Sequence, residues 1–375
     1  MIQNYSYKAY VIGLGRIGHL MEGETGRANP CTHSGCYQMH PKTFLCGGFD
    51  ISEERCNVFQ KNYPGTNVSS SDLVQQLAQL QPEIISVCTS SSTHLEILSK
   101  IKKAALGQSW LKGILLEKPV GVNLQEGEEI LRITQEINIP VIVCHDRRFY
   151  SDFRAFKDLI KKRGLGKFRQ ISGSIYCSSF VQGRGRSQKN LFFGGPLIHD
   201  GTHLFDLMIY YLGSPSHVSG ISLRQTQSTK TEDTSLGTLI FSEGVTGRFF
   251  VGGRRKYFHF ELELEWERAK LCYDNGRIRF LKKKPNSPFL IQSQTPRFTW
   301  TNPYLKRLDH LLEIIEKDSV NESSIEDGLL ALRVIESIYQ SSQRHGEIIS
   351  MYNGAKVPNQ IFRTQEVKEC TNLVI

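Results

Sequence analysis

Two histidines and an aspartate occur at helical spacing just past the middle of the chain. His199, His203 and Asp206 follow one another at intervals of four and three residues, so a helix here would place them on one face. Pro196 suits the first turn of that helix. Stacked imidazoles can move a proton to or from a substrate hydroxyl, while a nearby carboxylate fixes the tautomer. We predict an acid–base centre, with simple packing as the alternative. A metal site is less favoured because the Glu of a metalloprotease motif is missing.

A lysine occupies a second position suited to chemistry. Glu117, Lys118 and Pro119 follow the apolar run 114–116, which is typical of a buried strand. The carboxyl ends of such strands point into a ligand crevice, and proline keeps the preceding residue extended. Lys118 could therefore take part in proton transfer. The alternative is a lysine that only pairs with Glu117 at a domain edge.

A glycine-rich turn follows the first apolar run directly. It reads Gly13-Leu14-Gly15-Arg16-Ile17-Gly18 and opens a helical segment, which is the context that gives this motif its meaning. Gly13 would permit the tight turn, Gly15 the approach of a pyrophosphate, and Gly18 close packing of helix on strand. The helix N-terminus would face the phosphate charge. The motif predicts a dinucleotide site.

Asp50 ends the second apolar run and indicates which dinucleotide binds. A carboxylate here would accept hydrogen bonds from the adenosine ribose and repel a 2′-phosphate. No cation follows at once, Arg55 being the nearest. The sequence therefore favours NAD(H) over NADP(H).

The interval between Gly18 and Asp50 exceeds the usual spacing of about 20 residues. The extra residues fall in 22–37, where Gly23, Gly26 and Pro30 would break the first helix. This insert and its edge contain four possible metal ligands: Cys31, His33, Cys36 and His40. Their spacing matches no zinc pattern, so we predict no metal and a loop that borders the active site.

These residues need a scaffold, and the first 145 residues supply one. Short runs that are apolar throughout alternate with helix-length segments, which is typical of a parallel sheet covered on both faces. The predicted strands are 7–12, 44–49, 84–88, 114–116 and 141–144. Thr93 and Glu96 have the spacing of a helix capping box. We expect a doubly wound Rossmann domain over residues 1–145.

Beyond residue 150 the predicted strands are longer and alternate apolar with polar residues. They are 168–176, 218–223, 235–241, 245–250, 258–266, 271–273 and 278–281, the last two flanking the hairpin signal Asp274-Asn275-Gly276. Helices are predicted at 304–316 and 325–340, the second with a capping box at Ser323 and Glu326. The pattern favours a C-terminal α+β domain with an open, largely antiparallel sheet over residues 146–357. Residues 358–375 form a tail of unknown role.

Bulk composition excludes several classes of protein. The 375 residues are 39% hydrophobic and 22% charged, which is ordinary for a globular chain. No secretory signal or transmembrane run is visible, so we expect a cytoplasmic protein. The nine cysteines are scattered and several fall in apolar runs, which indicates reduced thiols. The net charge of +9 is spread in small clusters, so we expect no nucleic acid and no membrane partner, and favour an anionic small molecule instead.

Taken together, the motifs resemble the Gfo/Idh/MocA family of glucose–fructose oxidoreductase and inositol dehydrogenase relatives. The matching pieces span most of the chain in the right order: Gly13 to Gly18, Thr89 to His94, Glu117 to Pro119, Arg147 to Phe149, Gly194 to Asp206, and Asp327-Gly328. The resemblance implies hydride transfer between nicotinamide and a hydroxyl-bearing carbon of a sugar, sugar derivative or cyclitol. It also implies a homodimer or homotetramer formed through the C-terminal sheet.

The resemblance assigns roles residue by residue. Lys118 and His203 match the family's catalytic lysine and histidine, with His199 beside them. Cofactor contacts are expected from Gly13, Gly15, Arg16, Ile17, Gly18, Asp50, Thr89, His94 and Glu117. Substrate contacts are expected from Lys118, Arg148, Asp200 and His203.

The sequence departs from the family pattern at two places. The family commonly has Asp where His199 stands, and an amide where Asp146 stands. The proton relay is therefore rebuilt around His199 or weakened, and the substrate is expected to differ from those of well-known members. Arg147, Arg148, Arg184 and Arg186 favour a phosphorylated, nucleotide-linked or carboxylated sugar. The rival hypothesis is a non-catalytic NAD(H)-binding regulatory protein of the same fold, which would need neither Lys118 nor His203.

Overall fold

The short apolar runs of the N-terminal segment pair into one parallel sheet, in the order β3-β2-β1-β4-β5-β6. Its strands are β1 (Tyr7–Ile12), β2 (Thr43–Phe49), β3 (Asn67–Ser69), β4 (Ile84–Val87), β5 (Gly113–Leu116) and β6 (Val141–Val143). The five expected strands are all present, and the doubly wound fold is confirmed. Strand β3 was missed because its three residues are partly exposed and form no apolar run. The strand order reverses beside β1, which sets a ligand crevice at the carboxyl ends of β1 and β4.

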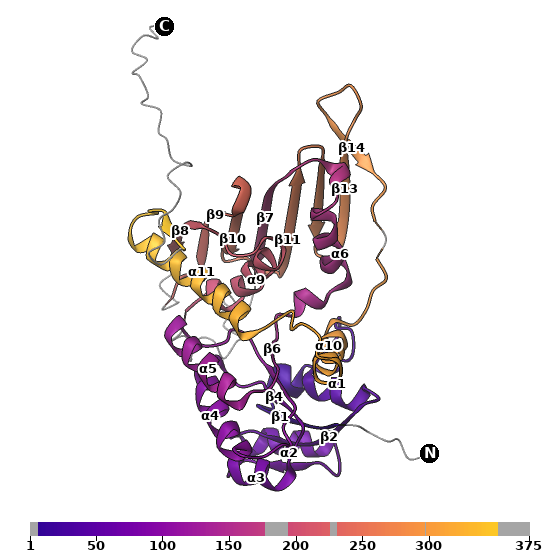
Figure 1. Cartoon of the computed structure of the whole chain (residues 1–375), viewed down its shortest axis with the longest axis vertical. Helices are drawn as coiled ribbons and strands as arrows, with labels where there is room; N and C mark the ends of the chain where they lie inside the picture. Colours follow the sequence, from indigo (N-terminus) through magenta and orange to yellow (C-terminus); the bar gives the residue numbers. More distant parts are fainter. Residues whose placement is uncertain (1–6, 177–193, 226–230, 297, 352–375) are drawn as a thin grey trace.

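Of the 375 residues, the computed structural model describes 7–176, 194–225, 231–296 and 298–351 (Figure 1). The helices around the first sheet are α1 (His33–Met39), α2 (Glu53–Asn62), α3 (Leu73–Leu80), α4 (His94–Ala105) and α5 (Leu124–Ile137). Side chains of Ser52, Asp72 and Asn123 cap the N-termini of α2, α3 and α5. The capping box predicted at Thr93 was wrong, because its hydroxyl donates to the Ser90 carbonyl instead.

The second sheet has nine strands in the order β14-β13-β12-β11-β7-β10-β9-β8-β15, and only β7 and β10 pair in parallel. The strands are β7 (Phe168–Tyr176), β8 (His217–Leu223), β9 (Thr234–Ile240), β10 (Thr246–Gly252), β11 (His259–Trp266), β12 (Ala269–Asp274), β13 (Arg277–Lys283), β14 (Leu290–Ser293) and β15 (Ile349–Ser350). The predicted, largely antiparallel sheet is confirmed. Asn275 and Gly276 have positive φ angles of 44° and 91°, as a tight hairpin turn requires.

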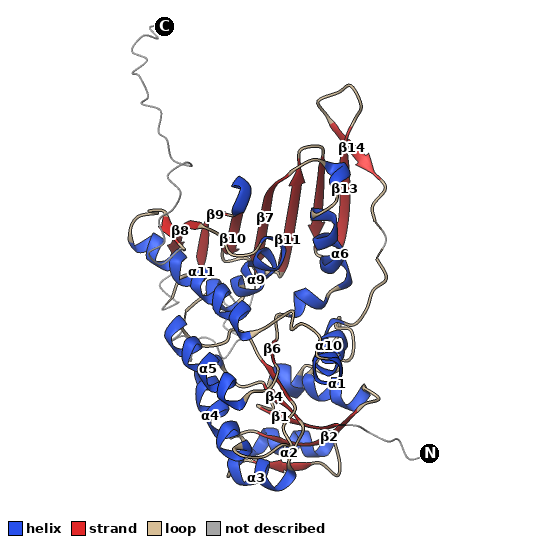
Figure 2. Cartoon of the chain, viewed as in Figure 1, coloured by secondary structure: helices blue, strands red, loops and turns tan. Residues whose placement is uncertain are grey.

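Helices of the second half lie on one face of this sheet or beside the first domain (Figure 2). They are α6 (Ser151–Ile160), α8 (Pro196–His199), α9 (Gly201–Leu212), α10 (Pro303–Lys317) and α11 (Ile325–Gln343). The capping box of α11 lies one residue later than predicted, with Ser324 and Asp327 as partners. Ser323 is not the cap, because its hydroxyl donates to the Val143 carbonyl.

Helix α10 returns from the C-terminal half to cover a face of the first sheet, where it lies beside α1 (Figure 1). Its residues Leu308, Leu311 and Leu312 are buried in one core cluster with Val11 of β1 and Ile84 of β4. The C-terminal segment therefore completes the core of the nucleotide domain. No helix of the described segments is long and apolar enough to cross a bilayer. Every cysteine in those segments is free and buried, as expected of reduced thiols.

Candidate active site

The glycine turn after β1 has the geometry that its motif predicts. Gly13 has a φ of +94°, and a Cβ there would lie 2.7 Å from backbone atoms of Cys88 and Thr89. A Cβ on Gly18 would lie 2.0 Å from the Gly13 carbonyl oxygen. A Cβ placed on Gly15 would have the Arg55 guanidinium as its nearest neighbour, at 3.8 Å. The space above Gly15 therefore has room for a pyrophosphate. The segment that follows is a single π-helical turn, Arg16–Leu20, so the expected helix is cut short by the insert.

Asp50 lies beside this turn at the end of β2, as predicted, but protein groups already engage its carboxylate. It accepts hydrogen bonds from the backbone amides of Leu14 and Ser52, each at 2.9 Å. The Arg55 guanidinium lies 3.0 Å from Oδ2, and Asp50 is 4% exposed. A ribose hydroxyl must therefore share this carboxylate with Arg55.

The Thr89 loop closes the other side of the crevice. The Thr89 hydroxyl is buried and has no hydrogen-bond partner among the described residues, which leaves it available to a ligand. His94, an expected cofactor contact, is fully buried, and its ring nitrogens lie 3.0 and 3.3 Å from the carbonyls of Val120 and Thr89. His94 thus braces the loop from behind.

The insert buries one histidine directly behind the Glu117 turn. His33 Nε2 lies 3.1 Å from a Glu117 carboxylate oxygen, and Nδ1 lies 2.7 Å from the Ser86 hydroxyl, which contacts Tyr37 Oη at 2.5 Å. Burial and the Arg307 charge lower the pKa of His33 to about 4, so the ring is neutral at pH 7. A neutral ring can accept from Ser86 at Nδ1 and donate from Nε2 to Glu117. The insert ends in helix α1 (His33–Met39), and its residue His33 packs behind the Glu117–Lys118 turn.

Arg307 of α10 joins the same cluster from the C-terminal half. Its guanidinium is ion-paired with Asp146, lies 3.8 Å from Glu117, and lies 3.1 Å from His33 Nε2. Burial alone would raise the pKa of Glu117, but the His33 hydrogen bond and the nearby cations outweigh it and lower that pKa to about 2. For Asp146 burial prevails over Arg307, and its pKa rises to about 6.

The insert's four candidate metal ligands do not converge among the described residues, since His40 pairs with Asp309 at 3.0 Å. A different set, His33, Glu117 and Cys144, places its potential ligand atoms within 4.8 Å of one another. The Arg307 guanidinium already contacts two members of this set. A fixed positive charge there opposes a cation, so the geometry does not support a metal centre.

Lys118 points away from Glu117 and toward the segment that carries the two histidines. Its Nζ donates to the carbonyl of His199 at 2.6 Å. The helix predicted across this segment is broken at Asp200, where α8 ends and α9 begins. Lys118 and burial together lower the pKa of His199, to about 4.

His203 lies on the first turn of α9, and burial, Lys118, Arg147 and His145 hold its pKa well below the usual range. Its Nδ1 is buried and has no hydrogen-bond partner among the described residues. The expected tautomer-fixing role of Asp206 is wrong, because the Arg148 guanidinium holds the Asp206 carboxylate and the ring that lies next to it, at 3.1 Å, is that of His145. A neutral imidazole with one open nitrogen can accept a proton from a substrate hydroxyl.

Arg148 is also engaged elsewhere, since Asp206 holds it through two nitrogens and Asp327 lies 3.1 Å away. It is 2% exposed, so this geometry does not support the predicted substrate contact. Asp200, at the junction of α8 and α9, lies within electrostatic range of Arg147.

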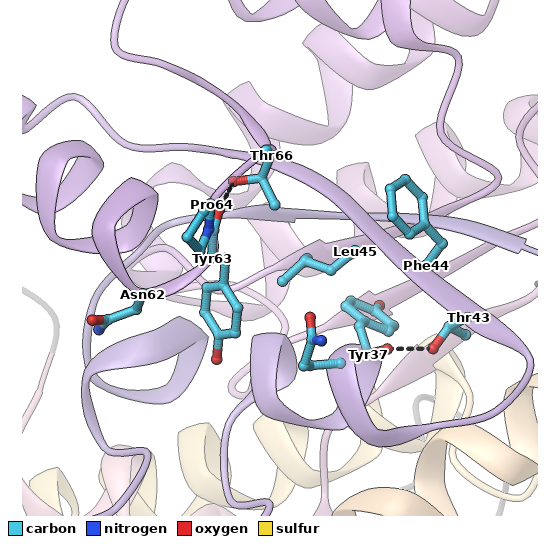
Figure 3. Close-up of a pocket in the computed structure, with 10 residues that line it drawn as sticks. Tyr37, Thr43, Phe44, Leu45, Asn62, Tyr63, Pro64 and Thr66 are labelled. Atoms are coloured by element: carbon cyan, nitrogen blue, oxygen red, sulfur yellow. Dashed lines mark hydrogen bonds between the residues drawn. The ribbon is translucent and has the colours of Figure 1, made fainter. Parts of the chain in front are cut away.

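A hollow elsewhere in the first domain is not part of this site. This cavity of about 430 Å³ is lined by Tyr37, Thr43, Leu45 and Tyr63 among others, which Figure 3 shows as sticks. It lies where β2 begins, at the sheet edge opposite the carboxyl ends that carry the glycine turn and Asp50. A smaller cavity of about 190 Å³ lies between the insert and the segment before α10, lined by Arg27, Tyr150, Trp300 and Tyr304 among others.

The sequence did not reveal the roles of His145 and Arg307, nor the contact between His33 and Glu117. The buried ion pair of Arg307 was predictable from the sequence. Arg307 lies one turn before Leu311 on the apolar stripe of its helix, and a charged residue buried at such a position is rarely unpaired. His33 and His145 had no such signal, since their partners Glu117 and Asp206 are distant in sequence.

A glycine turn that leaves room for a pyrophosphate lies after β1, and Lys118 follows β5 at the same edge of the sheet, which is the arrangement of a dinucleotide-binding protein of the Rossmann class. Residues 7–145 match the model of the oxidoreductase family with an NAD-binding Rossmann fold. Residues 153–279 match the GFO/IDH/MocA C-terminal domain. The chain belongs to the Gfo/Idh/MocA family.

Individual relatives are distant. The myo-inositol 2-dehydrogenase of Thermotoga maritima is 22% identical over 86% of this chain and 92% of its own length. The scyllo-inositol 2-dehydrogenase (NADP(+)) of Bacillus subtilis is 29% identical, but the match spans only 49% of each protein.

Solved structures of similar fold include a Bordetella pertussis dehydrogenase in complex with NADH and UDP-GlcNAcA. It superposes with a TM-score of 0.74 at 17% identity, covering 93% of this chain and 99% of that one. An Agrobacterium radiobacter oxidoreductase, solved with NAD+, L-tartaric acid and magnesium, has a TM-score of 0.73 at 14% identity, covering 92% and 98%. At these identities the likeness concerns the fold.

Proposed function

We propose that this protein is an NAD(H)-dependent dehydrogenase that transfers hydride between nicotinamide and a hydroxyl-bearing carbon of a sugar, sugar derivative or cyclitol. The observation that carries the proposal is the neutral His203, whose Nδ1 has no partner among the described residues and which lies within electrostatic range of Lys118. A bound nicotinamide supplies the hydride acceptor or donor. The relatives that are named inositol dehydrogenases support this class of substrate.

In the oxidation direction, the neutral His203 imidazole takes the proton of the substrate hydroxyl. The Lys118 ammonium, released from the His199 carbonyl, donates to the same oxygen and stabilises the negative charge that develops on it. In reduction His203 returns the proton. Lys118 comes from the first domain and His203 from the second, so the proposed reaction needs groups from both.

The cofactor we propose is NAD(H), because the buried Asp50 carboxylate would repel a 2′-phosphate. Arg55 is the group that could reverse this preference, since its guanidinium lies between Asp50 and the space above Gly15. One relative is named as NADP(+)-dependent. We therefore treat the Asp50–Arg55 pair as the selectivity switch.

The experiment is a fluorescence titration of the protein with NADH and with NADPH, alongside Asp50→Ala and Arg55→Ala. We expect tighter binding of NADH, loss of that preference in Asp50→Ala, and about tenfold weaker NADPH binding in Arg55→Ala. Absence of binding to either nucleotide, in folded protein free of carried-over cofactor, would remove the proposal. Binding without turnover of any sugar or cyclitol would instead favour a non-catalytic regulatory protein.

We also propose a homodimer or homotetramer formed through the second sheet. Leu223 of β8 and Leu236 of β9 are 39% and 41% exposed on that sheet, where a second copy could cover them. Light scattering after size exclusion would show a mass of two or four chains, and a single-chain mass at micromolar concentration would contradict it.

A further inference from the structure

Arg147 carries a charge that the described protein does not neutralise. Its guanidinium carbon lies 3.6 Å from the centre of the Phe260 ring, and the side chain is half-buried. The Nε atom is inaccessible and has no hydrogen-bond partner, and no described carboxylate lies within ion-pair distance of the guanidinium. A guanidinium offers five N–H donors, and leaving such a group buried without acceptors costs free energy.

The neighbouring Arg148 shows what the chain does with a structural arginine. Arg148 is held by Asp206 and Asp327 and donates to the carbonyl of Glu322. Among the described residues Arg147 has no comparable partner, and the carboxylate that affects it there, Asp200, does so through longer-range electrostatics. The internal segments outside the described residues, 177–193 and 226–230, contain no Asp or Glu that could pair with it.

Arg147 also lies where a substrate would bind. Its charge and that of Lys118 both act on His203, so all three groups share one region. Tyr150, Tyr273 and Tyr304 are within electrostatic range of the guanidinium. A cation held flat on a phenyl ring keeps its donors fixed in one plane, which suits two-point binding of an oxyanion.

We propose that Arg147, held against Phe260, binds an anionic group of the substrate, so that the preferred substrate is a sugar or cyclitol derivative bearing a carboxylate or a phosphate. This inference rests on the proposed dehydrogenase function and narrows its substrate class. Carboxylate and phosphate share the acceptor geometry that a guanidinium recognises, and the experiment separates them.

The test compares matched neutral and anionic probes at pH 7.5 with NAD+. Glucose, glucuronate and glucose 6-phosphate form one set. UDP-GlcNAc and UDP-GlcNAcA share the charged diphosphate and differ by one carboxylate, so this second pair reports the effect of that carboxylate alone. We expect at least one anionic probe to exceed its neutral counterpart in kcat/KM by about 10- to 100-fold in the wild type, the range that a charged two-point contact gives. Glucuronate and glucose 6-phosphate distinguish carboxylate from phosphate.

Arg147→Gln should remove that advantage, mainly through KM, so that kcat/KM falls at least about tenfold further for the anionic probe than for its neutral counterpart. Arg147→Lys should recover part of it, because it keeps the charge but not the fork of donors. Arg154→Gln is the matched control, since Arg154 pairs with Glu322 and is 42% exposed. Its preference should equal that of the wild type. Equal loss on neutral and anionic probes in Arg147→Gln, or a wild type that prefers neutral probes, would overturn the proposal.

Calorimetric binding of glucuronate and glucose 6-phosphate to NADH-loaded protein separates this inference from the proposed function. Binding that Arg147→Gln abolishes and Arg154→Gln retains would support the anion site even without turnover. Failure of every anionic probe to bind the wild type at millimolar concentration would overturn it. Loss of turnover with binding intact would count against the dehydrogenase assignment alone.

Discussion

The two sides of the Glu117–Lys118 turn differ in how their polar groups are satisfied. Behind the turn, His33, Ser86, Glu117 and Asp146 all have partners, and one nitrogen of Arg307, Nε, is the exception. In front of it, Thr89 Oγ1, Arg147 Nε and His203 Nδ1 have none among the described residues. A lost partner costs about 1–3 kcal/mol when a polar group is buried. We infer that the groups behind the turn are structural, because they are paired with one another, and that the unpaired groups in front of it bind ligands.

The largest expected effect lies in front of the turn. His203→Ala removes the proposed base and should lower kcat by about 10²- to 10⁴-fold while NADH binding and folding are retained. Steady-state kinetics with a confirmed substrate measures the loss. Near-normal turnover would mean that His203 is not the base, and that its unpartnered nitrogen does not mark the reaction site.

Arg307→Met should be the most damaging change behind the turn. It leaves Asp146 and Glu117 buried without their cation, so we expect the free energy of unfolding to fall by about 3–5 kcal/mol. Chemical denaturation measures it. Lys306→Met, on the exposed side of the same helix, is the control and should change stability by less than about 1 kcal/mol. Equal losses of stability in the two variants would contradict the structural role assigned to the buried cluster around Arg307.

A smaller effect is expected at His33. His33→Leu removes one hydrogen-bond partner each from Glu117 and Ser86 and should cost about 1–3 kcal/mol of stability. His33→Gln can still donate to Glu117 and should recover part of the loss. His40→Gln is the control, since the His40 ring hydrogen-bonds with Asp309 and the Lys42 amide in the described part of the chain and not with Glu117 or Ser86. If His33→Gln were no better than His33→Leu, the hydrogen bond to Glu117 would not be what stabilises the turn.

The smallest effect concerns pH. Beside burial, the Lys118 charge lowers the pKa of His203, so Lys118→Gln should raise that pKa. As the pH is lowered, the remaining activity of the variant should therefore begin to fall at a higher pH than the activity of the wild type. The unprotonated imidazole is the active form, so both profiles rise with pH. Measuring kcat/KM for oxidation between pH 5 and 8 tests this, and an unchanged profile would mean that the lysine charge does not act on His203.

Much of the fold was predictable from local patterns. Strands β1 and β7 match their predicted limits, because an apolar run and an alternating run each record burial directly. The break at Asp200 was not visible, since helical spacing continues across it. The cluster behind Glu117 was also out of reach, because His33 and Arg307 meet only after the insert and α10 have docked on the sheet.

The packing of α10 on the first sheet has a consequence for the order of folding during synthesis. Leu308, Leu311 and Leu312 share a core with Val11, yet they leave the ribosome almost three hundred residues later. Until then one face of the nucleotide-binding sheet stays open to solvent and Asp146 has no cation. The first domain to be translated is therefore not the first to be finished, and nascent chains that end before α10 should be recognised by chaperones as incomplete.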